Sequence, residues 1–138
     1  MKVFLDANVL VSVLNKEYPV FQYSSRVLSL ADNSKYKLYT SPICIAIAFY
    51  FAEKKCGAEL ARTKINYLIQ KLKITTVNQK TAEAVIKNKK IHDIEDGLQY
   101  YSAVESGCKH IVTEDSNDFY FSEIEVLNSK SFLENYIF

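Results

Sequence analysis

Hydrophobic residues occur in short runs, separated by longer stretches in which they recur at helical spacing. The run Lys2–Leu5 is apolar, with β-branched and aromatic character, which favours a strand buried on both faces. Four further strands are predicted at Lys37–Thr40, Ile74–Val77, His110–Thr113 and Glu125–Leu127. Because strands alternate with helices, we predict an α/β fold. Its central, mostly parallel sheet should lie between two helical layers, as a three-layer α/β/α sandwich.

Helical periodicity predicts seven helices, which begin at Asn8 and then cover Val20–Ala31, Ile43–Lys54, Glu59–Leu72, Thr81–Lys87, Asp93–Ser106 and Ser129–Tyr136. Ser41 and Pro42 are a favourable N-cap and first residue for the third of these. That helix is apolar almost all round, so we expect it to lie deep in the domain. The fourth is amphipathic, and we expect Leu60 and Ile69 to face the core.

Composition narrows the class of protein. The chain has 138 residues, and we treat residues 1–138 as a single domain. Its formal net charge is +1, so binding to nucleic acid needs a local patch. The cysteines, Cys44, Cys56 and Cys108, lack a C-x-x-C spacing, and we expect reduced thiols in a cytoplasmic protein. We expect no signal peptide and no membrane span, because no apolar run approaches ~18 residues.

Carboxylates gather at three element ends: Asp6 after the first strand, Asp93, Glu95 and Asp96 at the start of a late helix, and Asp115 and Asp118 after the fourth strand. Acidic residues are common at helix starts, so Asp6 can equally be an N-cap, and Asp93 and Glu95 are unremarkable alone. The carboxyl ends of parallel strands, however, meet at one edge of the sheet. Carboxylates that converge there repel one another unless a cation neutralises them. The pattern indicates a site for Mg²⁺ or Mn²⁺.

Three segments resemble the acidic signatures of PIN domains: KVFLDANVL at Lys2–Leu10, DGLQYYSA at Asp96–Ala103 and IVTEDSNDF at Ile111–Phe119. Each motif is weak alone, but their order and spacing fit over essentially the whole chain. The resemblance implies an α/β/α sandwich and a metal-dependent endoribonuclease that hydrolyses RNA phosphodiester bonds. Small single-domain members of this length, the VapC-like proteins, are commonly toxins of type II toxin–antitoxin pairs.

The resemblance also assigns residues. Asp6, Asp96 and Asp115 would be the ligands of Mg²⁺ or Mn²⁺, and Asp118 would be a fourth catalytic carboxylate. The metal would polarise the scissile phosphate and lower the pKa of a bound water, which then attacks in line. His92 and His110 have no part in that scheme, and each is expected to be structural or exposed.

Supporting residues follow from the same comparison. Thr113 would orient the site through its hydroxyl, Asn8 would support it, and we add Asp93 as a third supporting residue. Three basic residues precede the acidic helix: Lys87, Lys89 and Lys90. They are candidates to hold an RNA backbone, and a solvated loop explains them equally well.

One position departs from the family. The usual pattern S-x-x-T-x-x-E follows the second strand, and here Ile47 stands where the Glu is expected. We expect Ile47 to point toward the acidic cluster and to leave a weak, Mn²⁺-preferring nuclease. The alternative is a non-catalytic or weakly active PIN-like module that binds RNA or protein. A haloacid dehalogenase-type phosphatase is disfavoured because Asn8 replaces its second Asp, and a receiver domain because its acidic pair and Lys are not apparent.

Partners are suggested by apolar residues beyond what a small monomer needs: Phe21, Tyr23, Tyr67 and Tyr136–Phe138. They predict a homodimer and an antitoxin protein whose segment lies in a groove. RNA is the expected substrate.

Overall fold

A five-stranded parallel sheet lies at the centre of the fold in the computed structural model, which describes residues 1–138. Its strands are β1 (Lys2–Leu5), β2 (Lys37–Thr40), β3 (Lys73–Ile74), β4 (His110–Val112) and β5 (Glu125–Leu127), in the order β3-β2-β1-β4-β5. The predicted α/β fold with a parallel sheet is therefore confirmed. The third strand is shorter than predicted, because only Lys73 and Ile74 pair with β2.

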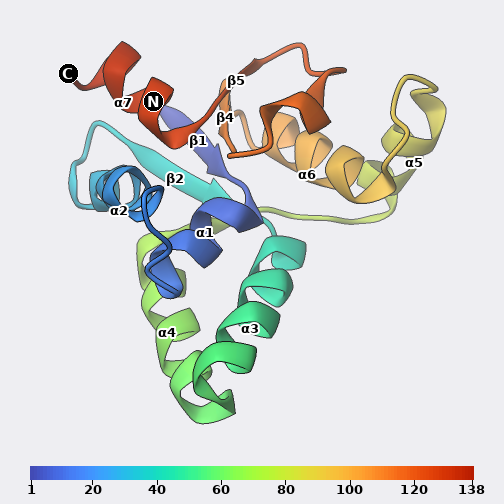
Figure 1. Ribbon diagram of the computed structural model, residues 1–138. Coiled ribbons are helices and arrows are strands. Elements are labelled where there is room, and N and C mark those ends of the chain that lie inside the picture. The colour runs from blue at the N-terminus through green and yellow to red at the C-terminus, as the bar shows by residue number, and fades with distance from the viewer.

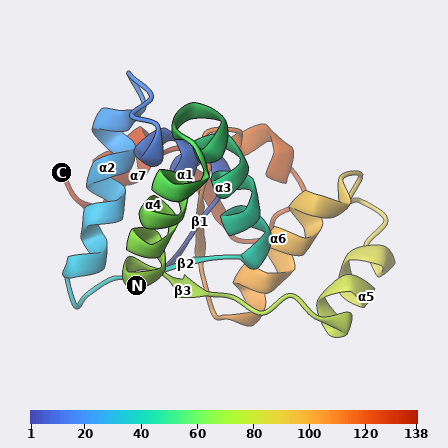
Figure 2. The ribbon, with the colours of Figure 1, turned by 90° about the horizontal axis from the view of Figure 1, so that it is seen from below.

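Seven α-helices surround the sheet: α1 (Ala7–Leu14), α2 (Phe21–Ser29), α3 (Pro42–Cys56), α4 (Ala58–Lys71), α5 (Gln79–Lys87), α6 (Ile94–Glu105) and α7 (Ser129–Tyr136). Two 3₁₀ helices, η1 (Leu30–Asp32) and η2 (Ser116–Phe119), complete the chain. The helices α1, α3 and α4 pack together on one side, and α5 pairs with α6 on the other (Figures 1 and 2). No helix has the length and hydrophobicity that crossing a membrane requires.

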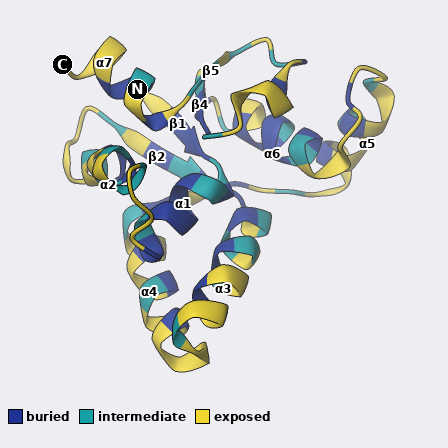
Figure 3. Ribbon diagram, in the orientation of Figure 1, coloured by how far each residue is buried: buried dark blue, intermediate teal, exposed yellow.

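The strand β1 is the centre of the core. Val3, Phe4 and Leu5 are fully buried, as expected for a strand with neighbours on both sides and helices on both faces (Figure 3). Leu5 stands opposite Val112 of β4, so both strands end at the same level. The residues that follow them, Asp6 and Thr113, are therefore brought side by side.

The helix α3 is less buried than predicted. Its buried residues are small ones, Cys44, Ala48 and Ala52, which share one face at a spacing of four residues. Its aromatic residues Tyr50 and Phe51 are 53% and 45% exposed. The hydrophobic composition gave the wrong depth because α3 and α4 form a hairpin that projects from the sheet (Figure 1). A narrow stripe of small residues is enough for that contact.

The interior of α4 also differs from the prediction. Leu60 and Ile69 are 49% and 44% exposed, whereas Ile65 and Leu68 are buried as expected. The buried residues continue the stripe begun by Ala61, three and four residues apart, and Leu60 and Ile69 lie off it.

The start of α3 is held beside α6. Ser41 is the predicted N-cap: its Oγ accepts a hydrogen bond from the Cys44 backbone N at 3.0 Å. The same hydroxyl hydrogen-bonds the side chain of Gln99 on α6. This buried contact fixes the two helices that face each other across the edge where β1 ends.

Candidate metal centre and its cleft

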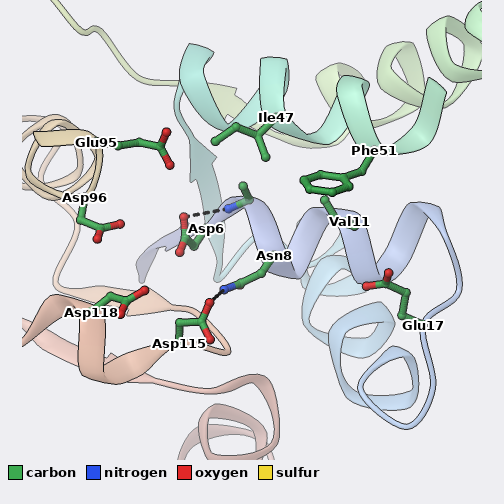
Figure 4. Close-up of a pocket in the computed structure, with 11 residues that line it drawn as sticks. Asp6, Asn8, Val11, Glu17, Ile47, Phe51, Glu95, Asp96, Asp115 and Asp118 are labelled. Atoms are coloured by element: carbon green, nitrogen blue, oxygen red, sulfur yellow. Dashed lines mark hydrogen bonds between the residues drawn. The ribbon is translucent and has the colours of Figure 1, made fainter. Parts of the chain in front are cut away.

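A cleft of about 360 Å³ lies at the carboxyl end of β1, between α1, α3, α6 and η2 (Figure 4). Five carboxylates line one half of it: Asp6, Glu95, Asp96, Asp115 and Asp118. The lining includes no Lys or Arg. The structure thus brings the four predicted catalytic aspartates into one cavity, from three different parts of the chain.

Asp6 is oriented through both of its carboxylate oxygens. Thr113, which is fully buried, donates its hydroxyl to Asp6 Oδ2 at 2.8 Å. The Ala7 backbone N donates to Asp6 Oδ1, also at 2.8 Å, which makes Asp6 the N-cap of α1. Both explanations of Asp6 are therefore compatible: one oxygen caps the helix, and the other is held by Thr113 at the edge of the cleft.

Asn8 connects α1 to the segment after β4. Its Nδ2 donates to Thr113 Oγ1 at 3.1 Å and to Asp115 Oδ2 at 3.3 Å. Its Oδ1 accepts from the Glu114 backbone N at 3.1 Å. Asn8 therefore links the Asp115 carboxylate to Thr113, which also donates to Asp6. Its supporting role in the site stays a prediction.

The beginning of α6 supplies two cleft residues and one cap. Asp93 Oδ1 accepts from the backbone N of Glu95 at 2.9 Å and of Asp96 at 3.4 Å, and Asp93 does not line the cleft. Glu95 and Asp96, in the first turn, both do. From the sequence, Glu95 was expected only to interact favourably with the dipole of α6. Its position beside Asp96, in the turn that faces the sheet edge, was the available signal.

The acidic half is electrostatically strained. Burial, followed by the negative charges of Asp93 and Asp6, raises the pKa of Asp96 to about 7. Burial also raises the pKa of Asp6, although the hydrogen bonds from Thr113 and Ala7 lower it in part. None of the protein's ion pairs involves a carboxylate of the cleft.

The donor set fits a divalent cation of the Mg²⁺ or Mn²⁺ type, because all the candidate ligands are hard carboxylate oxygens without a counter-charge. No three His, Cys, Asp or Glu side chains lie close enough to enclose an ion by themselves. The arrangement is therefore open, and it leaves coordination positions for water and for a phosphate oxygen. Burial raises the pKa of the neighbouring Cys44 to about 12, so that residue stays a neutral thiol.

The other half of the cleft is apolar. Ile47 lines it and is partly buried, so the predicted direction of this side chain is confirmed (Figure 4). Phe51 lies one turn further along α3, and Val11 faces both from α1. Glu17 lines the end away from the aspartates. Phe51, Val11 and Glu17 were not identified from the sequence, because their positions depend on how the helices dock.

The predicted basic patch is not part of the cleft. Lys87, Lys89 and Lys90 are exposed and absent from its lining. The loop that carries Lys89 and Lys90 is nonetheless anchored beside η2, because Tyr120, just after η2, donates its hydroxyl to the Lys90 carbonyl and accepts from the His92 backbone N at 3.2 Å. Contact with RNA outside the cleft remains a prediction for these lysines.

A second hollow, a groove of about 530 Å³, lies between α1, α2 and α4. It is lined by Phe21, Leu28 and Tyr67, with Lys16 and Lys64 among its polar residues. Two of the aromatic residues that suggested partners, Phe21 and Tyr67, are thus in this groove. The homodimer stays a prediction.

Comparison with known proteins gives a consistent picture. A family model described as "PIN domain" matches residues 2–117. The chain is 31% identical over 139 residues to the curated protein Ribonuclease VapC1 from Aquifex aeolicus (strain VF5), and the match covers 98% of this chain and 95% of that protein.

Solved structures share the fold at lower identity. VapBC2 from Rickettsia felis, bound to a DNA fragment from its promoter, matches with a TM-score of 0.67 at 21% identity, over 93% of this chain and 98% of that one. Mycobacterium tuberculosis VapC20, a toxin that cleaves the sarcin-ricin loop, matches with 0.69 at 13%, over 90% and 98%. VapBC-1 from nontypeable Haemophilus influenzae matches with 0.68 at 17%, over 94% and 99%.

Proposed function

The chain belongs to the PIN-domain family, and from that premise we propose that it is a metal-dependent endoribonuclease, the toxin of a type II toxin–antitoxin pair. The observation that carries this proposal is a cleft at the end of β1 whose acidic half holds five carboxylates and whose lining includes no basic side chain. The 31% identical relative is named a ribonuclease, which supports the same activity. We propose that the protein acts on RNA in the cytoplasm.

We propose Asp6, Asp96 and Asp115 as the metal-binding residues, with Asp118 as a fourth catalytic carboxylate. Dependence on a divalent metal is typical of PIN nucleases, and the hard oxygen donors favour Mg²⁺ or Mn²⁺. When bound, the ion supplies a Lewis acid for the scissile phosphate and lowers the pKa of a water molecule. The aspartates bind and orient, and Asp96 must lose its proton to do so, since its pKa is about 7.

Thr113 and Asn8 are the proposed positioning residues. Thr113 fixes Asp6 through its hydroxyl, and Asn8 donates to Asp115 from the opposite side. Such partners limit the rotation of ligating carboxylates, and their loss typically costs about 10- to 100-fold in metal affinity. We propose that Asp93 acts indirectly, by capping the helix turn that carries Asp96.

A second candidate function is a non-catalytic PIN-like module that binds RNA or protein. Ile47 in the cleft favours it, because an apolar side chain occupies the direction from which the family's Glu would enter. Mg²⁺ often uses only one or two protein carboxylates together with water and substrate phosphate. The open acidic half is therefore sufficient for catalysis, and we place the enzyme first.

The experiment that separates the two is RNA cleavage by the purified protein. Structured RNAs are incubated with Mg²⁺, Mn²⁺ or EDTA, and Asp96→Asn is the matched control. The enzyme should cleave with metal, and neither the EDTA sample nor Asp96→Asn should. Binding of the same RNAs without cleavage under any metal condition would establish the non-catalytic module instead.

An antitoxin is the protein partner that we propose, and the groove between α1, α2 and α4 is its proposed binding site. Apolar side chains line this groove and lysines contribute its positive charge, which suits an amphipathic segment with acidic residues. Expression of the chain alone in a bacterial host should arrest growth, and Asp96→Asn should relieve the arrest. Arrest that persists with Asp96→Asn would contradict a nuclease toxin.

A further inference from the structure

The apolar half of the cleft has no part in the metal chemistry. It is continuous with the acidic half and consists of Val11, Ile47 and Phe51, with Glu17 at its far end (Figure 4). Asp6 stands at the boundary, since the next turn of α1 carries Val11. A substrate whose phosphate reaches the aspartates must therefore place its neighbouring groups along this wall.

Phe51 is available for stacking. It lies four residues after Ile47, hence on the same face of α3, and 45% of its surface is exposed. Its only aromatic neighbour is Tyr50, which meets it edge-on, with ring centroids 5.2 Å apart and planes at 84°. No cation–π contact uses the ring either. A large aromatic side chain at a cleft wall without stacking partners can receive a flat ligand.

Hydrogen bonds hold the backbone of Glu17 in place, whereas its carboxylate has no partner within the protein. Lys16 adopts a φ of 49°, a left-handed conformation that is uncommon for residues other than glycine, and it turns the chain back after α1. The Glu17 N then donates to the Ser12 carbonyl at 2.9 Å, and the Glu17 carbonyl accepts from Phe21 N at 2.7 Å. Its carboxylate makes no hydrogen bond or ion pair and lines the cleft.

A flat apolar surface followed by a hydrogen-bond acceptor matches a nucleobase, whose faces stack and whose edge carries donors. We propose that this half of the cleft binds the base beside the scissile phosphate, that Phe51 stacks on it, and that Glu17 selects guanine. The proposal rests on the ribonuclease function above. Guanine is favoured because its N1–H and N2–H are adjacent donors that one carboxylate can accept together, whereas the other bases offer no such pair.

The size of the cavity is consistent with a single nucleotide. At about 360 Å³ the whole cleft is near the lower limit of small-ligand sites, which run from about 300 to 1,000 Å³. A phosphate in the acidic half and one base in the apolar half use both of its surfaces. The rest of the RNA chain must then run outside the cleft. The preference for guanine should therefore concern one base, next to the cleaved bond.

Neutral nucleosides test the base site without phosphate or metal. The isotope-labelled protein in EDTA is titrated with guanosine, adenosine, cytidine or uridine, and shifts of cleft resonances are followed by NMR. Guanosine should bind about tenfold more tightly than the other three, the discrimination typical of a paired base contact. Phe51→Ala should weaken guanosine binding about tenfold, and Phe51→Trp should retain it. Tyr50→Ala is the matched control, because Tyr50 is an aromatic residue of similar exposure, 53%, and does not line the cleft.

The role of Glu17 is tested by measuring how strongly the protein prefers guanosine to adenosine. Glu17→Ala should bring guanosine down to the affinity of adenosine, whereas Glu53→Ala, an exposed acidic residue of α3 outside the cleft, should leave the preference intact. Mapping of cut sites on a random-sequence RNA pool with Mn²⁺ should then show guanine beside the cut in the wild type and a relaxed pattern in Glu17→Ala. A merely structural role of either residue would lower activity without changing which base is preferred.

The outcomes of the base site and of the nuclease are separable. Guanosine binding without RNA cleavage would retain the base site and overturn the ribonuclease. Cleavage without a base preference, together with no nucleoside shifts at the cleft, would overturn the base site and retain the nuclease. Equal binding of all four nucleosides, unchanged in Glu17→Ala, would refute the selection of guanine.

Discussion

The two halves of the cleft are built in different ways. In the acidic half, Asp6 and Asp115 follow the ends of β1 and β4, and Glu95 and Asp96 lie in the first turn of α6. Hydrogen bonds fix the direction of Asp6, since Thr113 and Ala7 both donate to it. In the apolar half, Ile47 and Phe51 project from α3; Ile47 packs against the core, and 45% of Phe51 is exposed. The register of β1 and β4 places Asp6 and Asp115 almost independently of the helices, whereas the positions of Ile47 and Phe51 depend on how α3 docks against α1.

Each half of the cleft lowers the stability of the folded protein when the cleft holds only water, and the two halves do so for different reasons. The acidic half concentrates like charge, which together with burial raises the pKa of Asp96. The apolar half leaves much of Phe51 in water. A cation relieves the first cost and a base relieves the second, so stability and function compete here, as is common at active sites.

The largest effect is expected at the centre of the acidic half. Asp6→Asn removes a charged ligand and keeps an oxygen that can still cap α1. Metal affinity and RNA cleavage should fall by at least about 100-fold, beyond the usual loss of a supporting partner. Calorimetric titration with Mn²⁺ measures the affinity. The melting temperature of the metal-free protein should stay equal or rise, because one like charge is gone. A large fall would show that the residue is mainly structural.

Thr113→Val tests how far hydrogen bonds build the acidic half. The substitution removes the donor to Asp6 and leaves the backbone N of Asp115, which donates to the same hydroxyl at 3.2 Å, without a partner. We expect a loss of about 1 to 3 kcal/mol in the free energy of unfolding. Metal affinity should fall about 10- to 100-fold. Thr113→Ser, which retains the hydroxyl, is the control, and an equal loss in both variants would assign the effect to packing.

The sequence was most informative where strands determine position. The run Lys2–Leu5 predicted β1 with correct bounds, because a strand buried on both faces has a continuous apolar pattern. Asp6, Asp115 and Asp118 could be expected at one edge, since parallel strands end together, and the resemblance to the PIN signatures added Asp96 to them. The third strand was predicted too long. Ile74 pairs with Thr40, the last residue of β2, so the residues after Ile74 have no strand beside them although their pattern is typical of a strand.

The sequence was least informative about helix faces. An all-round apolar α3 gave no indication of which side is buried, and Phe51 was therefore missed. Leu60 was assigned to the core although α4 packs through a different stripe. Glu17 was missed because nothing in the sequence predicts the left-handed backbone of Lys16, which turns the chain just before Glu17. Such positions depend on how the helices pack together, and the hydrophobic pattern along the sequence does not predict that packing.

A pH series tests the charge of the acidic half. The pKa of Asp96 in the folded protein, about 7, lies above its usual value of 3.8, so the folded state binds the extra proton. The stability of the metal-free protein should therefore fall as pH rises from about 4 to 7, and then level off. Mn²⁺ affinity should weaken about tenfold between pH 6 and pH 5, because binding must displace that proton. Thermal melts in EDTA and calorimetric titrations measure the two trends, and Asp96→Asn should flatten both.

The smallest effect is expected where the halves meet, at Ile47. Ile47→Glu adds a carboxylate from the direction in which the family usually carries one, and its side chain lines the cleft, so the new charge can be hydrated. We expect about fivefold tighter Mn²⁺ binding, or about 1 kcal/mol, because repulsion from Glu95 and Asp6 offsets part of the gain. RNA cleavage should rise in proportion, and the metal-free variant should melt earlier than the wild type and recover with Mn²⁺. Ile47→Gln is the control for charge, because glutamine has the shape of glutamate without its charge. It should improve neither Mn²⁺ binding nor RNA cleavage. A variant that unfolds without recovery would mean that Ile47 belongs to the core and that the acidic half already has its full set of ligands.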